Sequence, residues 1–240
     1  MTNPRRSSAK GNYAAILRLL AKHPKSSLVL DCPCGEGALA QRILDDGFRL
    51  EVGDYFPDLF VLPQLKAAKT DLNSRLPFND QHFDVVICCD GMSDIGFQRN
   101  ALAEFRRILK PGGTLLLALP NILNIRSRLR FLCSGFLNKF RSPLDEINGQ
   151  STTRPIAWWE LRYMMVREGF AIRTLTHNRV KIGELLALML YVIPMIGMLW
   201  MAARLWFQRK KTPHALRVLR ECNGASVLLG ESLIVEATLP

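Results

Sequence analysis

The sequence predicts an α/β fold in which helices cover both faces of a mostly parallel, seven-stranded sheet. Continuous apolar runs of strand length alternate along the chain with segments whose apolar residues recur at helical spacing. Strands buried on both faces read as unbroken apolar runs, and such strands are typical of parallel sheets covered by helices. Hydrophobic residues make up 48% of the 240 positions, which is enough for a full core.

The first half of the chain contains most of this alternation. Residues 1–24 predict an amphipathic first helix and not a signal peptide, because Arg18 and Lys22 interrupt a short apolar run. Residues 37–47 predict a helix that ends at Gly47. Strands are expected at 27–32, 48–54, 67–71, 83–90 and 114–120, and an amphipathic helix at 97–113 that is ended by Pro-Gly-Gly.

The second half predicts two further strands and two further helices. One helix is expected at 153–170, with Pro155 near its first turn. Before it, an amphipathic helix is expected from five apolar residues at helical spacing: Ile122, Ile125, Leu129, Leu132 and Phe136. The last two strands are expected at 171–177 and 231–239.

The net charge of +11 is concentrated in three segments. Residues 1–30, 121–143 and 204–220 together hold 17 Lys and Arg and no acid, so the rest of the chain is net acidic. Basic patches of this kind attract polyanions, either nucleic acid or an anionic lipid surface, unless they are simply solvated faces.

The six cysteines predict reduced thiols and no metal site. No CxxC pair occurs and only four His are present, so a zinc site is not expected. Cys88 and Cys89 fall in an apolar run and are expected to be buried. Reduced thiols are typical of a cytoplasmic protein.

A glycine-containing loop follows the first strand and opens a helix, in the stretch VLDCPCGEG. Gly35 and Gly37 lack Cβ atoms and allow a ligand to approach the main chain. The helix that begins near Gly37 presents free N–H groups to an anion. Asp54 stands at the end of the second strand, where its carboxylate can accept hydrogen bonds from both hydroxyls of a ribose.

These motifs resemble class I S-adenosylmethionine-dependent methyltransferases. Residues 31–37, Asp-Cys-Pro-Cys-Gly-Glu-Gly, resemble the DxGxGxG loop of that family, with Pro33 in place of the first glycine. Asp54 matches the ribose-binding acid, and Asp71-Leu72 followed by LPF at 76–78 matches the segment at the adenine edge. FDVVICCD (83–90) and LKPGGTLLLALPN (109–121) match the fourth strand and the motif around the fifth.

The resemblance covers residues 27–121, with 153–177 and 231–239 as the last strands, and it implies a fold, a cofactor and a binding site. The implied fold is a Rossmann-like sheet whose last strand is antiparallel and lies beside the sixth. The implied cofactor is S-adenosylmethionine. Pro33 fixes φ and removes an N–H, which alters the loop at that point. The residues implied to bind the cofactor are Asp31, Cys32, Pro33, Cys34, Gly35, Gly37, Asp54, Tyr55, Asp71, Leu72 and Asp90.

Other ligands and roles for this loop are less well supported. A nicotinamide-binding domain is disfavoured because the loop is one residue shorter than GxGxxG. A family member without activity, or a non-catalytic or RNA-directed binding protein, stays open because the chain is basic. No RNA-binding module and no interleaved aromatic-basic motif is present.

Methyl transfer from a sulfonium is an in-line displacement, so the protein mainly aligns the acceptor and excludes water. A hydroxyl acceptor also benefits from a general base, and the candidates are Asp90 and Asp94 in CDGMSDI, just past the fourth strand. The alternative roles are a cofactor contact for Asp90 and a helix N-cap for Asp94, and for Asp94 the cap is favoured. The strand end lacks the NPPY-type signature of nucleobase methylation, so no DNA substrate is expected.

Acceptor specificity is expected to reside in 120–154, the segment after the fifth strand. Arg126, Arg128 and Arg130 fall mostly off its apolar stripe, which suits either a membrane surface or a helix packed on the sheet. The amino-acid sequence of this segment also resembles that of methyltransferases found with surface-glycan and lipid-linked sugar synthesis. The expected acceptor is therefore small or lipid-linked, a hydroxyl of a glycan or lipid intermediate, and the alternative is an isoprenoid quinone precursor.

Residues 185–203 are nineteen consecutive residues without a charge, inside an insertion at 182–208. A single membrane crossing would place strands six and seven on opposite sides of the bilayer. Basic residues flank the stretch on both sides, and Pro194 and Gly197 break its middle. We expect one domain over 1–240 whose insertion makes a monotopic or peripheral contact with the anionic inner membrane face. A helix pair packed on the domain or on a second copy is the alternative.

Overall fold

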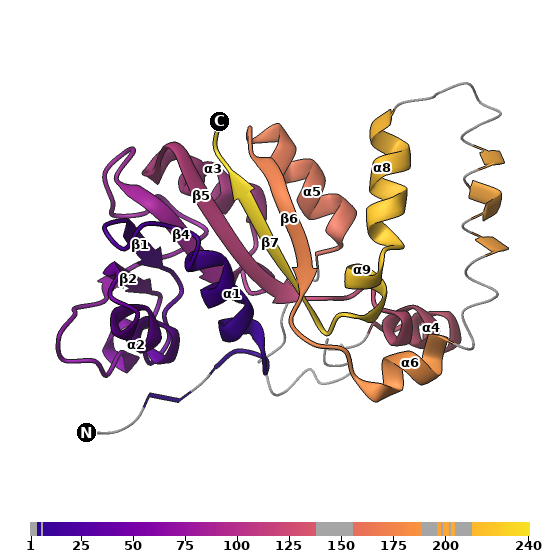
Figure 1. The fold of residues 1–240 in the computed structure, drawn as a ribbon, viewed down its shortest axis with the longest axis horizontal. Helices are drawn as coiled ribbons and strands as arrows, with labels where there is room; N and C mark the ends of the chain where they lie inside the picture. The colour runs from indigo at the N-terminus through magenta and orange to yellow at the C-terminus, as the bar shows by residue number, and fades with distance from the viewer. Residues whose placement is uncertain are drawn as a thin grey trace.

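The computed structural model describes residues 4–5, 7–137, 156–188, 196–197, 199–201, 203–204 and 213–240. Its centre is one seven-stranded sheet in the order β3-β2-β1-β4-β5-β7-β6 (Figure 1). The first five strands pair in parallel, and β7 pairs antiparallel with both β5 and β6. The strands are β1 (Leu28–Asp31), β2 (Arg49–Asp54), β3 (Ala68–Lys69), β4 (Phe83–Cys89), β5 (Leu109–Pro120), β6 (Ala171–His177) and β7 (Ser232–Thr238).

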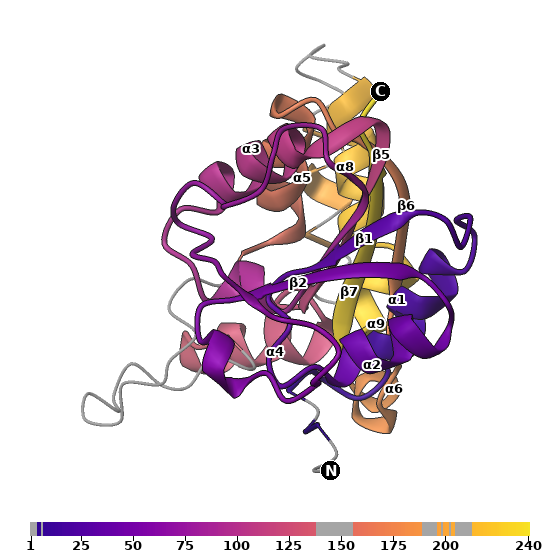
Figure 2. The same ribbon diagram turned by 90° about the vertical axis from the view of Figure 1, so that its left-hand side faces the viewer.

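Helices cover both faces of this sheet (Figures 1 and 2). One face packs on α1 (Asn12–Leu20) and α2 (Ala38–Asp45), and the other packs on α3 (Gln98–Ile108), α5 (Trp158–Arg167) and α9 (Ala225–Leu229). The remaining helices described are α4 (Ile125–Ser134), α6 (Ile182–Leu188), α8 (Pro213–Cys222) and the 3-10 turns η1 (Pro57–Leu59) and η2 (Gly91–Ser93).

Alternation along β4 shows why the sheet is buried on both faces. Val85 and Ile87 pack against the α1 and α2 side, whereas Val86 and Cys88 pack against α3 and α5. Successive side chains of a strand point to opposite faces, so an unbroken apolar run fills both layers. The predicted fold class is confirmed, including the antiparallel last strand beside the sixth, and Cys88 and Cys89 are buried as predicted.

Two predicted helices are wrong in extent. The helix expected at 97–113 ends at Ile108, because Leu109 already pairs with Phe83 and the Pro-Gly-Gly lies within β5. A register irregularity between Phe83 and Val85 accommodates those residues before Thr114 pairs with Val85. The helix expected at 153–170 is α5, Trp158–Arg167, and residues 153–155 lie outside the described part.

The stripe predicted after β5 is only partly a packing stripe. Ile122 and Ile125 are buried, and Ile125 packs with Ala187 of α6. Leu132 on the last turn of α4 is 67% exposed. The part of the acceptor segment at 138–155 lies outside the described residues.

The insertion predicted at 182–208 is described only in part. It begins with α6, and short helical pieces follow between Ile196 and Arg204. Of the two residues predicted to break it, Gly197 lies in one of these helical pieces. Pro194 lies outside the described residues, within 189–195, as does the stretch 205–208. Within the described part, every helix is too short or too polar to cross a lipid bilayer.

Candidate cofactor and active site

The glycine loop connects the end of β1 to the start of α2 at the carboxyl edge of the parallel strands. Gly35 donates its N–H to Asp54 Oδ2 at 2.8 Å, and the Cys34 N–H bonds the carbonyl of Gly53 at 3.0 Å. Gly37 precedes the first residue of α2 with a φ of 101°. A Cβ at Gly37 would stand 2.9 Å from the Phe60 ring, so both the backbone and the packing require glycine here.

Asp54 ends β2 and faces the loop, as the ribose-binding role requires. Its Oδ2 accepts the Gly35 N–H, and its Oδ1 accepts the Phe56 N–H at 2.9 Å. A carboxylate has about four lone-pair positions, so each oxygen can accept a further hydrogen bond. The Asp54 side chain is buried but lines a cavity. Its carboxylate, held by these two hydrogen bonds, is therefore a hydrogen-bond acceptor at the cavity wall.

That cavity has a volume of about 440 Å³, within the roughly 300–1,000 Å³ typical of ligand sites. The rings of Tyr55 and Phe56 meet edge to face at its mouth, with centroids 4.9 Å apart, and both are largely exposed. The Nζ of Lys69 lies 4.0 Å above the Tyr55 ring. Its lining residues are Pro33, Asp54, Tyr55, Phe56, Thr70, Asp71, Leu72, Asn73, Gly91, Asp94 and Ile95.

The far wall of the cavity is held by a turn at Asp71. Asp71 Oδ1 accepts the Asn73 N–H at 2.9 Å, and this and other hydrogen bonds lower the pKa of Asp71. Asn73 Oδ1 in turn accepts the N–H groups of Gly96 and Phe97. The segment after β3 and the segment after β4 are thereby tied together across the cavity.

Asp31, at the end of β1, is almost completely buried. Its side chain is 1% exposed, and neither carboxylate oxygen has a hydrogen-bond partner among the described residues. Burial and the nearby charge of Asp54 raise the pKa of Asp31 well above that of an ordinary carboxyl. Asn12 Oδ1 is also buried without a partner in the described part of the chain. Two buried acceptors that lack donors suit a cationic or hydrogen-bonding ligand.

The stability of the Asp31→Asn variant tests whether the pKa of Asp31 is raised in the folded protein. Because the pKa of Asp31 is raised in the folded state, its contribution favours folding most below the ordinary carboxyl pKa and is lost as the pH rises through the raised value. The amide cannot ionise, so D31N should be more stable than the wild type at neutral pH and equal to it in acid. Chemical denaturation at both pH values measures this, and equal free energies of unfolding at neutral pH would contradict it.

Of the two candidate bases, Asp90 does not line the cavity. Its Oδ2 accepts the Ser8 hydroxyl at 2.5 Å, and both of its oxygens accept the Asn12 amide, at 3.2 and 3.4 Å. The carboxylate therefore faces the N-terminal segment and α1. Its backbone has a φ of 66° and lies at the turn from β4 into η2.

Asp94 does line the cavity, and it does not cap α3. The residue preceding α3 is Phe97, whereas Asp94 ends η2. The prediction of a cap rested on the usual signal, an acid shortly before a helix. Partial burial and the charge of Asp90 raise the pKa of Asp94, which makes its carboxylate a better proton acceptor.

The remaining predicted residues form the loop itself. Cys32 and Cys34 are buried, burial raises the pKa of the Cys32 thiol to about 12, and the pKa of Cys34 is also raised. Both are therefore packing groups and not nucleophiles. Pro33, after a cis peptide bond, lines the cavity and packs its ring against Gly91.

Several residues in and around the cavity were not predicted from the sequence. Asn73 could have been found, since an Asx turn follows Asp71 directly. Ser8 and Asn12 could not, because they reach Asp90 from about 80 positions away in sequence. The lining residues that were not predicted are Phe56, Thr70, Asn73, Gly91 and Ile95.

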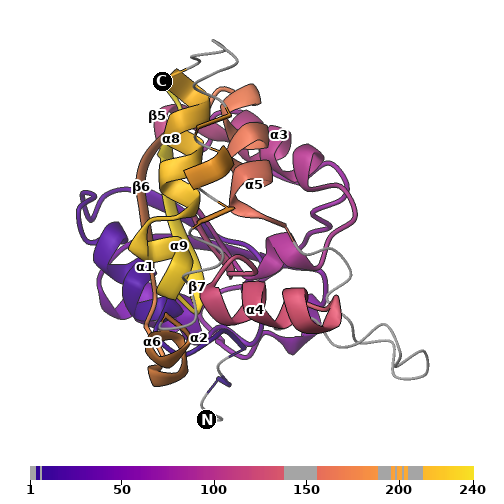
Figure 3. The same ribbon diagram turned by 90° about the vertical axis from the view of Figure 1, so that its right-hand side faces the viewer.

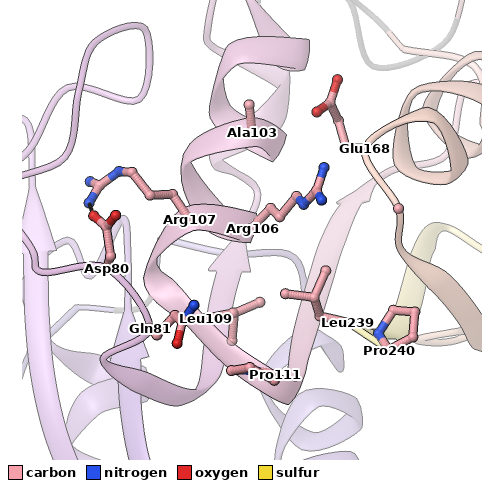
Figure 4. Close-up of a pocket in the computed structure, with 11 residues that line it drawn as sticks. Asp80, Gln81, Ala103, Arg106, Arg107, Leu109, Pro111, Glu168, Leu239 and Pro240 are labelled. Carbon is pink, nitrogen blue, oxygen red and sulfur yellow. Dashed lines mark hydrogen bonds and ion pairs between the residues drawn. The ribbon is translucent and has the colours of Figure 1, made fainter.

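A second cavity, of about 590 Å³, lies at the opposite edge of the sheet, around the start of β5 (Figure 4). Three of its charged lining residues are held in ion pairs. Arg107 bonds Asp80 at 2.6 Å and also Glu104 at 2.7 Å, and Glu168 bonds Arg99 at 2.8 Å. In open parallel sheets, ligands bind at the carboxyl edge. The cavity at Asp54 is therefore the candidate site.

The fold and this site define a class of protein. Residues 30–117 match the family model described as a methyltransferase domain. They are a class I S-adenosylmethionine-dependent methyltransferase domain, and S-adenosylmethionine is the cofactor of that class.

Two relatives each match slightly under half of the chain. An uncharacterized protein of Methanocaldococcus jannaschii is 37% identical over 112 residues, 45% of this chain and 48% of the relative. A demethylmenaquinone methyltransferase of Deinococcus radiodurans is 32% identical over 114 residues, 43% of this chain and 46% of the relative. The matches thus span less than half of each relative.

Solved structures share the whole fold at low identity. A SAM-dependent methyltransferase from Archaeoglobus fulgidus has a TM-score of 0.58 at 14% identity, covering 94% of this chain and 92% of its own. The [4+2]-cyclase SpnF has a TM-score of 0.56 at 17% identity, covering 98% of this chain and 85% of its own. A fold shared with a cyclase does not by itself fix the reaction.

Proposed function

We propose that this protein transfers the methyl group of S-adenosylmethionine to a small or lipid-linked acceptor. The observation that carries the proposal is the cavity at the carboxyl ends of β2 and β4, with Asp54 on its wall. The carboxylate of Asp31 is buried nearby without a hydrogen-bond partner in the described part of the chain. When bound, S-adenosylmethionine supplies an electrophilic methyl group on a sulfonium centre. We likewise propose that the residues named above bind this cofactor.

The residues present fit each part of that cofactor. Asp54 offers acceptors to two ribose hydroxyls, and the exposed rings of Tyr55 and Phe56 offer faces to a purine. Asp71 and Leu72 line the wall where its edge would be read. Asp31, which is buried close enough to Asp54 to sense its charge, offers a carboxyl group to the cationic part.

Asp94 is the proposed general base for a hydroxyl acceptor. It stands at the cavity wall on the segment after β4, and its raised pKa favours taking a proton. Asp90 is assigned instead to positioning, because Ser8 and Asn12 hold it. It fixes the N-terminal segment against the end of β4.

Two acceptor classes have support. A hydroxyl of a glycan or lipid intermediate follows from the resemblance of the segment after β5. An isoprenoid quinone precursor is supported by the demethylmenaquinone methyltransferase of Deinococcus radiodurans, which is 32% identical to this chain over 114 residues. The acceptor side at 120–154 lies wholly outside the matched residues 30–117, so the match does not choose between the two acceptor classes.

Transfer of labelled methyl from S-adenosylmethionine tests the proposal. The purified protein should label one of two acceptors, a lipid-linked sugar or a demethylated quinol, and Asp94→Asn should lower kcat roughly 100-fold or more while cofactor binding in calorimetry is unchanged. Asp58→Asn, an exposed acid outside the cavity, is the control. Failure of the wild type to bind S-adenosylmethionine, together with a salt-dependent shift of RNA, would favour an RNA-directed protein instead.

A further inference from the structure

Helix α5 carries two apolar stripes, of which the fold uses only one. Trp158, Leu161 and Met165 are buried against the sheet. Trp159, Tyr163 and Val166 recur at i, i+4 and i+7 and are 54%, 63% and 49% exposed. Large apolar side chains gathered on one helix face mark an interaction surface more often than scattered ones do.

The exposed stripe lines a groove against α8. The groove has a volume of about 670 Å³, and Trp159, Tyr163 and Val166 face Ala215 and Val218 across it. Leu216 beside it is 45% exposed. Figure 3 shows α5 and α8 on the same side of the molecule. We refer to this surface as the α5–α8 face. Its residues are Trp159, Tyr163, Val166, Arg167, Leu216, Arg217 and Arg220.

Positive charge surrounds these apolar groups. Arg167 lies over the Tyr163 ring at 6.0 Å, and Arg217 and Arg220 are exposed on α8. Beyond α8, the exposed Trp200 is covered by Arg204 at 5.5 Å. Together α5, α8 and the described residues of 196–204 hold five arginines and two acids, a net charge of +3. Two of these arginines, Arg162 and Arg217, pair with Glu221.

Apolar side chains, interfacial Trp and Tyr, and flanking arginines are together the composition that binds an anionic bilayer surface. Aromatic rings enter the headgroup region, and cations are attracted to acidic lipids at its surface. We propose that the α5–α8 face docks on an anionic membrane. A nucleic acid would use the arginines and leave the apolar stripe in water, so the stripe favours the lipid.

Docking on a membrane would bring the cofactor cavity close to lipid-linked acceptors. This consequence of docking rests on the proposed function. α4 lies on the same side of the molecule as α5 and α8 (Figure 3), and Phe131 and Leu132 are exposed on it. α4 follows β5 directly at the carboxyl edge, where the cofactor cavity also lies. An acceptor held in the membrane would therefore approach the cavity past α4.

Vesicle co-sedimentation of the full chain tests the proposal. The wild type should bind phosphatidylcholine vesicles that contain phosphatidylglycerol and bind pure phosphatidylcholine much less. Trp159→Glu and Tyr163→Glu should each lower the partition coefficient roughly tenfold or more. Each removes an aromatic group that docking would bury in the bilayer interface, and each adds a charge that the anionic surface repels. The matched control is Leu59→Glu, because Leu59 is 57% exposed but lies on η1, away from this face.

The charge contribution has its own matched pair. Arg220→Glu should weaken binding to the anionic vesicles, whereas Arg75→Glu, an exposed arginine far from this face, should not. Calorimetry with S-adenosylmethionine on every variant shows that the fold is intact. It also separates the two proposals. If the wild type binds vesicles but not S-adenosylmethionine, the proposed function is contradicted and the docking proposal is retained.

Three outcomes would overturn the docking proposal. The wild type fails to bind anionic vesicles, or Trp159→Glu and Tyr163→Glu bind them as the wild type does, which would place the lipid contact elsewhere in the chain. In the third outcome, the wild type does not bind vesicles and elutes as a dimer, and Trp159→Glu converts that dimer to a monomer. The occupant of the groove would then be a second copy of the chain.

Discussion

Replacing Asp54 with Ala should weaken S-adenosylmethionine binding by roughly 100-fold or more. Hydrogen bonds to a charged group contribute roughly 1.5–3 kcal/mol each, and the substitution removes the acceptor of two ribose hydroxyls. Isothermal titration calorimetry measures the change. Asp58→Ala, an exposed acid four residues later, should bind the cofactor as the wild type does.

The same substitution should also cost folding stability, whereas the sequence alone predicts little effect on folding. Asp54 accepts the N–H groups of Gly35 and Phe56, and removing it leaves both donors without that partner. A cost of roughly 1–3 kcal/mol is expected. Asp54→Asn retains one acceptor oxygen and should fall between Asp54→Ala and the wild type in both measurements. Binding of S-adenosylmethionine by Asp54→Ala at wild-type affinity would contradict the assignment.

Gly37→Ala should destabilise the protein by about 2–5 kcal/mol. The left-handed backbone at a φ of 101° disfavours a side chain by roughly 1–2 kcal/mol, and a Cβ only 2.9 Å from Phe60 adds an overpacking cost of roughly 1–3 kcal/mol. Gly47→Ala is the matched control. Gly47 has a φ of 82°, but a Cβ added there would meet no described atom within 4 Å, so it should show the backbone cost alone.

Thermal or chemical denaturation of both variants separates the two costs. The difference between Gly37→Ala and Gly47→Ala measures the packing of the loop against Phe60 and Leu62. Equal destabilisation of the two variants would show that the loop can move away from these side chains, and would remove the packing argument for glycine at position 37.

The elements could be predicted because their apolar pattern is local. β6 is found at 171–177 as expected, and β7 at Ser232–Thr238 differs from the prediction by one residue at each end. The error at 97–113 has a physical cause. Pro-Gly-Gly usually ends a helix, but here Leu109 has already joined the sheet, and the pairing with Phe83 decides the boundary.

The site could be predicted only where its residues follow strand ends. Asp54, Tyr55, Asp71 and Leu72 line the cavity because the carboxyl ends of parallel strands meet at one edge. Asp90 follows a strand as well, yet Ser8 and Asn12 hold it, and no periodicity or spacing reveals a contact between the N-terminal segment and β4. The burial of Asp31 without a partner among the described residues is likewise a property of the folded chain.

A crystal structure of the full chain with S-adenosylmethionine tests the central claim most directly. The ligand is predicted in the cavity beside Tyr55 and Asp71, with both ribose hydroxyls within hydrogen-bond distance of the Asp54 carboxylate. Density for the ligand in the cavity beside Arg106, or an Asp54 carboxylate turned away from a bound ribose, would contradict it.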